Sequence, residues 1–212
     1  AYTNVDGAEN NEELAFKING LSLEIISLVI RKFNKKNKPI ALIHFSSDYV
    51  FNGSGSKPWN PRDIPEPLNI YGSSKLNGER AIISADIPYI ILRISWIYSV
   101  FNTNFLVSIL KKIKKGDDLR VVSDQIGTPT SAYFIAEFCH HIFCNSNYIE
   151  KTGLYHLAPK GEASWFDFAT YILQFSRENS NLLRKSATKV IPVLSKDYVS
   201  IAERPKNSRL DS

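Results

Sequence analysis

Short apolar runs of strand type alternate with longer stretches of helical period along this 212-residue chain. The apolar runs cover residues 40–45, 89–94, 119–122, 154–157 and 190–193. The stretches with apolar residues at helical spacing cover about 12–33, 71–84, 104–115, 132–143 and 164–177. Ser164 is expected to cap the last of these helices. Continuous apolar strands separated by helices are typical of a parallel sheet whose two faces are both buried. We therefore predict an α/β fold in which helices cover both faces of a parallel sheet.

Polar and aromatic residues follow two of these predicted strands. In open parallel sheets, ligands bind beyond the carboxyl ends of the strands. Ser47 and Asp48 follow the run 40–45, and Trp96 follows the run 89–94. A hydroxyl or carboxyl group in this place can bind a ligand oxygen, but Ser and Asp also serve as turn and cap residues. Trp96 taken alone is better explained as a core or interface aromatic, whereas for Ser47 and Asp48 both interpretations stay open.

Tyr71 and Lys75 form a Y-x-x-x-K pair at the start of the predicted helix 71–84. Residues four apart lie on one helix face, so the Lys75 ammonium is expected close to the Tyr71 phenol. A nearby positive charge lowers the pKa of a phenol from its ordinary value of about 10. Tyr71 would then be a usable proton donor to a carbonyl under reduction. Chance alone gives about one such pair in a chain of this composition. The evidence that this pair is functional is therefore its position after a strand-end serine.

Charge and composition argue against several classes of protein. The formal net charge is +5, and the basic residues are spread out except for Lys111, Lys112, Lys114 and Lys115. That cluster is interpreted as a solvated helix end or as a field that attracts an anionic substrate. No basic motif interleaved with aromatic residues predicts nucleic-acid binding, and no apolar run approaches the ~20 residues of a membrane span. The segment 203–210 is interpreted as a solvated tail, although Arg204 could meet a phosphate.

The two cysteines, Cys139 and Cys144, form neither a disulfide framework nor a metal-type pair. The neighbouring His140 and His141 lie on the same predicted amphipathic helix without a second ligand cluster. We therefore predict no metal site from these residues, and a reducing, cytoplasmic setting.

Six motifs, in order along the chain, resemble the dTDP-4-dehydrorhamnose reductase family of extended short-chain dehydrogenases/reductases. They are Asp48-Tyr49-Val50-Phe51-x-Gly53, Tyr71-Gly72-x-x-Lys75, Arg93-x-Ser95-Trp96-x-Tyr98, Asp124-Gln125-x-Gly127-x-Pro129-Thr130, Gly153-x-Tyr155-His156-Leu157 and Arg204-Pro205-x-Asn207-Ser208-x-Leu210. The opening Ala1-Tyr2-Thr3 also resembles the segment after that family's fourth strand. Each motif alone is weak, and the ordered set is specific.

The resemblance implies a Rossmann-like doubly wound parallel sheet with a small C-terminal substrate lobe. It assigns residues 1–95 and about 126–158 to an NAD(P)-binding domain, and about 96–125 and 159–212 to the substrate-binding lobe. The family's first strand and Gly-rich phosphate loop would precede residue 1, and its terminal helix would follow Arg209. We therefore expect a chain truncated at both ends.

The implied activity is the NADPH- or NADH-dependent reduction of the 4-keto group of dTDP-4-dehydro-L-rhamnose to dTDP-L-rhamnose. Tyr71 matches the proton donor, Lys75 the residue that tunes it and holds the nicotinamide ribose, and Ser47 the hydroxyl that orients the carbonyl. The positions that match cofactor contacts are Ala1, Tyr2, Thr3, Phe45, Tyr71 and Lys75. The positions that match substrate contacts are Ser47, Asp48 and Trp96. The resemblance also allows a Mg²⁺ ion and a homodimer.

Two alternatives stay open. One is a related sugar-nucleotide epimerase or dehydratase; dehydratases usually place acidic residues beside the hydroxyl, and no Glu follows Asp48 here. The other is a non-catalytic regulatory subunit resembling that of methionine adenosyltransferase. The presence of Ser47, Tyr71 and Lys75 together favours an enzyme. The preference between NADPH and NADH is left open.

Overall fold

The computed structural model describes residues 1–37, 39–145, 149–181 and 188–212. Its α-helices are α1 (Val5–Glu9), α2 (Glu12–Phe16), α3 (Ser22–Asn34), α4 (Ile70–Ile83), α5 (Phe105–Lys115), α6 (Ala132–Asn145) and α7 (Trp165–Asn179). Its strands are β1 (Leu42–Ser47), β2 (Tyr89–Ile94), β3 (Ile97–Tyr98), β4 (Leu119–Val122), β5 (Ile126–Gly127), β6 (Thr130–Ser131), β7 (Gly153–His156), β8 (Ala163–Ser164) and β9 (Val190–Val193). A π-helical turn covers Lys17–Leu21, and 3-10 turns cover Asp48–Val50 and Ser195–Asp197.

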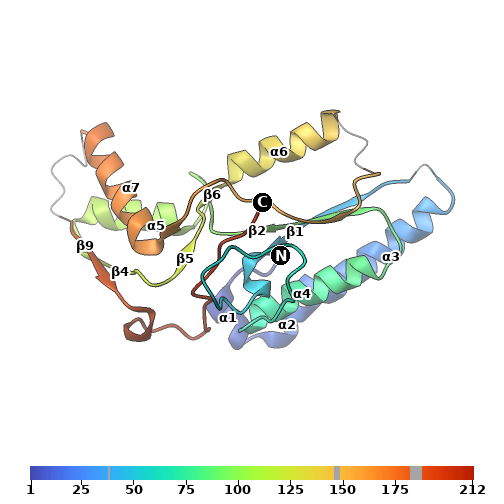
Figure 1. Cartoon of the computed structure of the whole chain (residues 1–212), viewed down its shortest axis with the longest axis horizontal. Helices are drawn as coiled ribbons and strands as arrows, with labels where there is room; N and C mark the ends of the chain where they lie inside the picture. Colours follow the sequence, from blue (N-terminus) through green and yellow to red (C-terminus); the bar gives the residue numbers. More distant parts are fainter. Residues whose placement is uncertain (38, 146–148, 182–187) are drawn as a thin grey trace.

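A three-stranded parallel sheet in the order β1-β2-β7 is the centre of the fold. Successive side chains of the middle strand point to opposite faces. Ile90 and Leu92 pack against Ile135 of α6, whereas Ile91 packs against Ile82 of α4. Helices α3 and α4 lie on one side of the sheet and α6 lies on the other (Figure 1). Both faces are buried, as the continuous apolar strands predict.

A second, smaller unit lies beside the sheet and contains α5, α7 and the parallel pair β4–β9 (Figure 1). Its core is formed by Ile113 of α5, Val121 of β4 and Leu173 of α7. Helix α7 begins with a capping box in which Ser164 and Asp167 bond each other's backbone N–H groups, which stabilises a helix start. The serine cap predicted from the sequence is therefore present.

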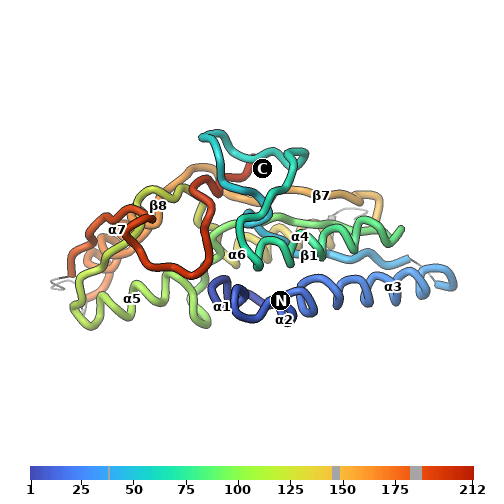
Figure 2. The backbone as a smooth tube through the Cα atoms, turned by 90° about the horizontal axis from the view of Figure 1, so that it is seen from below, coloured from blue at the N-terminus to red at the C-terminus, as the bar shows by residue number. Residues whose placement is uncertain are grey.

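The C-terminal segment runs back from the second unit to the sheet (Figure 2). Leu210 forms a bridge with Trp59, and the Ser212 hydroxyl donates to the carbonyl oxygen of His156 at 3.0 Å. The prediction of a solvated tail at 203–210 is wrong, because Leu210 is buried and Arg204 is held in an ion pair with Asp6 at 2.7 Å.

The first predicted helix and the first predicted strand differ most clearly from the sequence-based expectation. The single helix expected over 12–33 is divided by the π-helical turn, because periodicity cannot reveal one extra residue in a turn. Strand β1 extends to Ser47, since the backbones of Ser46 and Ser47 pair with the neighbouring strand. The predicted strands 89–94, 119–122 and 190–193 coincide with β2, β4 and β9. No helix in the described part of the chain is both long and apolar enough to cross a membrane.

Candidate functional site

The carboxyl end of β1 carries a hydroxyl and a carboxyl group side by side. The Ser47 hydroxyl donates to Asp48 Oδ1 at 3.0 Å and accepts the backbone N–H of Tyr49 at 3.1 Å. Ser47 thereby caps the 3-10 turn that follows the strand. This local hydrogen bonding fixes both side chains at the edge of the sheet where ligands bind in parallel α/β folds.

Tyr71 lies at the start of α4 and reaches the end of β1. Asn69 caps this helix by accepting the backbone N–H of Gly72 at 2.8 Å. A Cβ atom on Gly72 would lie 2.1 Å from the carbonyl oxygen of Tyr49, so only glycine permits this close approach. The Tyr71 phenol lies close enough to the Ser47 hydroxyl for Ser47 to lower its pKa. The structure therefore brings the predicted proton donor and the predicted orienting hydroxyl close together.

The pKa of Tyr71 is raised to about 12, in the opposite direction to the sequence-based prediction. Burial is the largest cause and outweighs the effect of Ser47, which lowers the pKa. Lys75 does not offset burial, because its ammonium donates to the Phe45 carbonyl at 2.6 Å and lies 3.4 Å from His44 Nε2. The phenol therefore keeps its proton at neutral pH, which a proton donor requires.

Lys75 is buried beneath Tyr71 on the same face of α4. Burial lowers the pKa of Lys75 to about 8, whereas the carboxylate of Glu79 raises it. Burial and the Lys75 charge lower the pKa of His44 to about 3. At neutral pH the ammonium is therefore mostly charged and the imidazole is neutral.

Asp48 is almost fully buried, and its Oδ2 has no hydrogen-bond partner among the described residues. Burial raises the pKa of Asp48 to about 7, while hydrogen bonds from Ser208 and Ser47 lower it. Buried carboxyl oxygens without partners are uncommon in folded proteins. Asp48 Oδ2 is therefore a hydrogen-bond acceptor that the described part of the chain leaves unused, at the same edge of the sheet as Ser47.

The buried Asn19, in the π-helical turn, is a site residue that the sequence did not reveal. Its side chain accepts the backbone N–H of Tyr2 at 2.8 Å and donates to the Tyr2 carbonyl at 3.0 Å. It also donates to the Ser74 hydroxyl of α4 at 3.0 Å. The predicted cofactor segment Ala1-Tyr2-Thr3 is thus attached beside the helix that carries Tyr71. An amide within an amphipathic stretch gives no sequence signal of this role.

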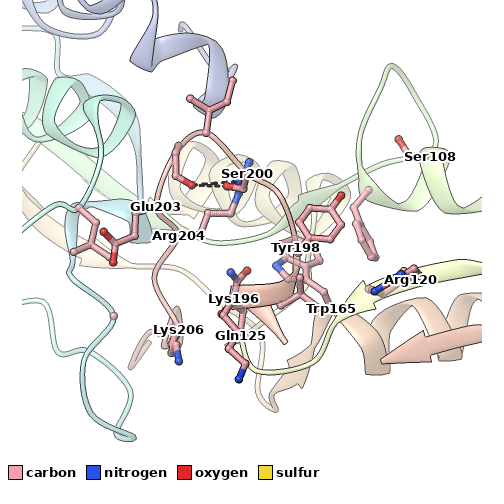
Figure 3. Close-up of a pocket in the computed structure, with 18 of the residues that line it drawn as sticks. Ser108, Arg120, Gln125, Trp165, Lys196, Tyr198, Ser200, Glu203, Arg204 and Lys206 are labelled. Carbon is pink, nitrogen blue, oxygen red and sulfur yellow. Dashed lines mark hydrogen bonds between the residues drawn. The ribbon is translucent and has the colours of Figure 1, made fainter. Parts of the chain in front are cut away.

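A cavity of about 850 Å³ lies between the second unit and the segment 195–206 (Figure 3). Its basic lining residues are Lys112, Arg120, Lys196, Arg204 and Lys206. Its aromatic lining residues are Phe105, Trp165 and Tyr198. The volume falls in the range of small-molecule sites, and the basic groups suit phosphate oxygens. The aromatic walls suit a planar ring.

Arg204 and Tyr49 connect this cavity with the Ser47–Tyr71 pair. Arg204 lines the cavity, and its guanidinium lies near enough to the Tyr49 hydroxyl for the two to shift each other's pKa. The Tyr49 ring then meets the Tyr71 ring edge-on at a centroid distance of 5.6 Å. Ser47, Tyr71 and Lys75 do not line the cavity, and Arg204 and Tyr49 lie between these groups and the cavity.

Trp96, the predicted substrate contact, lies behind the cavity wall. Its side chain stacks on Trp165 with a centroid distance of 3.6 Å and also packs closely against Gly127. Trp165 lines the cavity, whereas Trp96 is only 8% exposed. The backbone of Trp96 has a φ of +48°, a conformation that non-glycine residues adopt mostly at constrained sites. Its role as a substrate contact stays a prediction.

The described residues contain no group of three or more His, Cys, Asp or Glu side chains placed to hold a metal ion. Cys139 and Cys144 are free thiols on α6. The Mg²⁺ ion allowed by the resemblance therefore receives no support from the described side chains.

Comparison with known proteins gives matches over the whole chain. The family model described as the RmlD substrate binding domain matches residues 1–212. The dTDP-4-dehydrorhamnose reductase of Escherichia coli K12 is 36% identical over 213 residues, which cover 100% of this chain and 69% of that protein.

Solved structures agree with this result. The dTDP-4-dehydrorhamnose reductase of Bacillus anthracis, in complex with NADP, superposes with a TM-score of 0.87 at 31% identity and covers 100% of this chain and 69% of that one. The dTDP-glucose 4,6-dehydratase DesIV of Streptomyces venezuelae superposes with a TM-score of 0.75 over 100% of this chain and 62% of that one. At 13% identity, the second match shows the fold alone. The predicted Rossmann-type α/β fold is confirmed.

Proposed function

This chain belongs to the family of the RmlD substrate binding domain, and we propose on that basis that it reduces the 4-keto group of dTDP-4-dehydro-L-rhamnose to give dTDP-L-rhamnose. The observation that carries the proposal is the proximity of the Tyr71 phenol to the Ser47 hydroxyl at the carboxyl end of β1. Because Lys75 lies one turn further along α4, the groups needed for carbonyl reduction occupy one edge of the sheet.

The proposed chemistry follows from these groups. Bound NADPH supplies a hydride to C4 of the sugar. Tyr71 donates its phenolic proton to the C4 oxygen, and Ser47 holds that oxygen by a hydrogen bond. An alkoxide is far more basic than a phenolate, so proton transfer from Tyr71 is favourable despite its raised pKa of about 12. Solvent then returns the proton to Tyr71, and the charged Lys75 would bind the nicotinamide ribose.

The residues present fit a nicotinamide dinucleotide. An ammonium group has several N–H donors, and Lys75 uses one of them on the Phe45 carbonyl. The others can bind ribose hydroxyls beside the segment Ala1-Tyr2-Thr3, which Asn19 attaches to α4. The NADP in the B. anthracis structure supports NADPH as the cofactor.

We further propose that the basic and aromatic cavity binds the nucleotide diphosphate part of the substrate. On this proposal, the unit that contains the sheet binds the dinucleotide and the second unit binds the sugar nucleotide. The free thiols of Cys139 and Cys144 suit a reducing cytoplasmic setting. A homodimer stays a prediction.

The test is the loss of NADPH absorbance when the protein is mixed with dTDP-4-dehydro-L-rhamnose, followed by identification of the product. Substrate-dependent oxidation with formation of dTDP-L-rhamnose is the expected result. Binding of NADPH without turnover of this substrate would count against the reductase. A different product sugar would favour a sister enzyme with the same fold.

A further inference from the structure

A buried ion pair lies directly behind the candidate catalytic lysine. Glu79 of α4 and Arg93 of β2 bond in a bidentate manner, with Nε to Oε1 at 2.9 Å and the second nitrogen to Oε2 at 2.7 Å. Their side chains are only 1% and 3% exposed. The Arg93 guanidinium also lies 4.9 Å from the centre of the Phe51 ring, a cation–π contact.

This pair is not explained by stability alone. Removing two charges from water costs about as much free energy as their attraction returns, and well-packed apolar residues often replace such pairs without loss. The position of the pair offers another role. Glu79 follows Lys75 by one helical turn, so the two side chains lie on one face of α4. The Glu79 carboxylate favours the charged form of Lys75 against the effect of burial.

The other titratable groups near Lys75 cannot take this role. His44 of β1 is neutral at physiological pH and is itself repelled by the Lys75 charge. Tyr71 on α4 keeps its proton. Asp48 follows β1, and its Oδ1 accepts a hydrogen bond from Ser47 and not from Lys75. Arg93 is positive, so its field opposes that of Glu79.

We propose that Glu79 and Arg93 are opposing positioning residues for Lys75. Glu79 keeps the ammonium charged and directed at the Phe45 carbonyl, and Arg93 limits the attraction of Lys75 toward the carboxylate by holding both of its oxygens. The proposal rests on the proposed reductase function, because it takes Lys75 as the residue that must be charged during turnover.

Substitutions of Glu79 and Arg93 are expected to shift the pH–activity profile in opposite directions. In Glu79→Gln the ammonium of Lys75 is less favoured, so the alkaline limb of the pH–activity profile moves to lower pH. In Arg93→Met the carboxylate acts on Lys75 without opposition, so the same limb moves to higher pH. A change of one buried charge at this range predicts a shift of roughly one pH unit in each case. In the double variant the limb lies between those of the single variants.

The experiment measures kcat and kcat/KM against pH for the wild type, both single variants and the double variant. Arg80→Met is the matched control, because Arg80 is exposed on the same helix; its profile should coincide with that of the wild type. Thermal unfolding of each variant identifies pH ranges in which the protein is folded, and the double variant keeps the test valid if one single variant does not fold.

Limbs that move in opposite directions support the proposal. If the active variants have the same alkaline limb as the wild type, the proposal is overturned, and the role of the ion pair is structural only. If the wild type does not turn over the keto sugar, the proposed function fails. The pH dependence of NADPH binding, followed by nucleotide fluorescence in the same variants, then decides the role of the pair separately.

Discussion

Tyr71→Phe removes one oxygen atom and is expected to reduce turnover while it leaves folding stability nearly unchanged. The Ser47 hydroxyl would still donate to Asp48 at 3.0 Å and accept the N–H of Tyr49 at 3.1 Å. No buried hydrogen-bonding group is left without a partner, so the free energy of unfolding should change by no more than about 1 kcal/mol. The phenyl ring keeps its edge-on contact with Tyr49.

Turnover should fall strongly, although the free energy of unfolding changes little. Loss of a general acid costs about 100- to 10,000-fold in rate, which corresponds to roughly 3–5 kcal/mol in the activation barrier. The assay is steady-state oxidation of NADPH with the keto sugar, together with NADPH binding by fluorescence, which should stay near the wild-type value. Tyr155→Phe is the control, because this half-exposed tyrosine of β7 loses only its hydrogen bond to the Lys151 carbonyl at 3.1 Å.

Tyr71 would be removed from the mechanism if Tyr71→Phe turned over as fast as Tyr155→Phe. A large loss of activity accompanied by an equally large loss of unfolding free energy would also refute the reasoning, because Ser47 would then depend on the phenol for its position.

Three further substitutions test other parts of the site. Burial raises the pKa of Asp48 from 3.8 to about 7, so the stability of the wild type relative to Asp48→Asn should fall by up to about 4 kcal/mol as pH rises through that window. Denaturant unfolding of both proteins at each pH measures this difference, which removes the contributions of the buried histidines. Gly72→Ala places a Cβ 2.1 Å from a backbone oxygen and should destabilise by about 1–3 kcal/mol, measured as a lower Tm with reduced turnover. Trp165→Ala should raise KM for the sugar nucleotide about tenfold, equivalent to about 1.4 kcal/mol, with little change in kcat; an unchanged KM would remove Trp165 from the binding site.

The sequence by itself determined the elements and part of the chemistry. Strands 89–94, 119–122 and 190–193 were predictable because apolar periodicity reports which short segments are buried. The shared helix face of Tyr71 and Lys75 followed from helix geometry, and the helix start after Ser164 followed from cap chemistry. The ordered motifs indicated the family that the comparisons confirm.

Only the tertiary structure decided how these groups act on one another. Lys75 turns to the Phe45 carbonyl, so burial sets the pKa of Tyr71 and the expected direction was wrong. Arg204 joins the site through Asp6, which is 198 residues away in the chain. Asn19 reaches Ser74 across 55 residues. Periodicity and spacing report local geometry, whereas desolvation and ion pairing depend on which distant segments pack together, and that packing exists only in the folded chain.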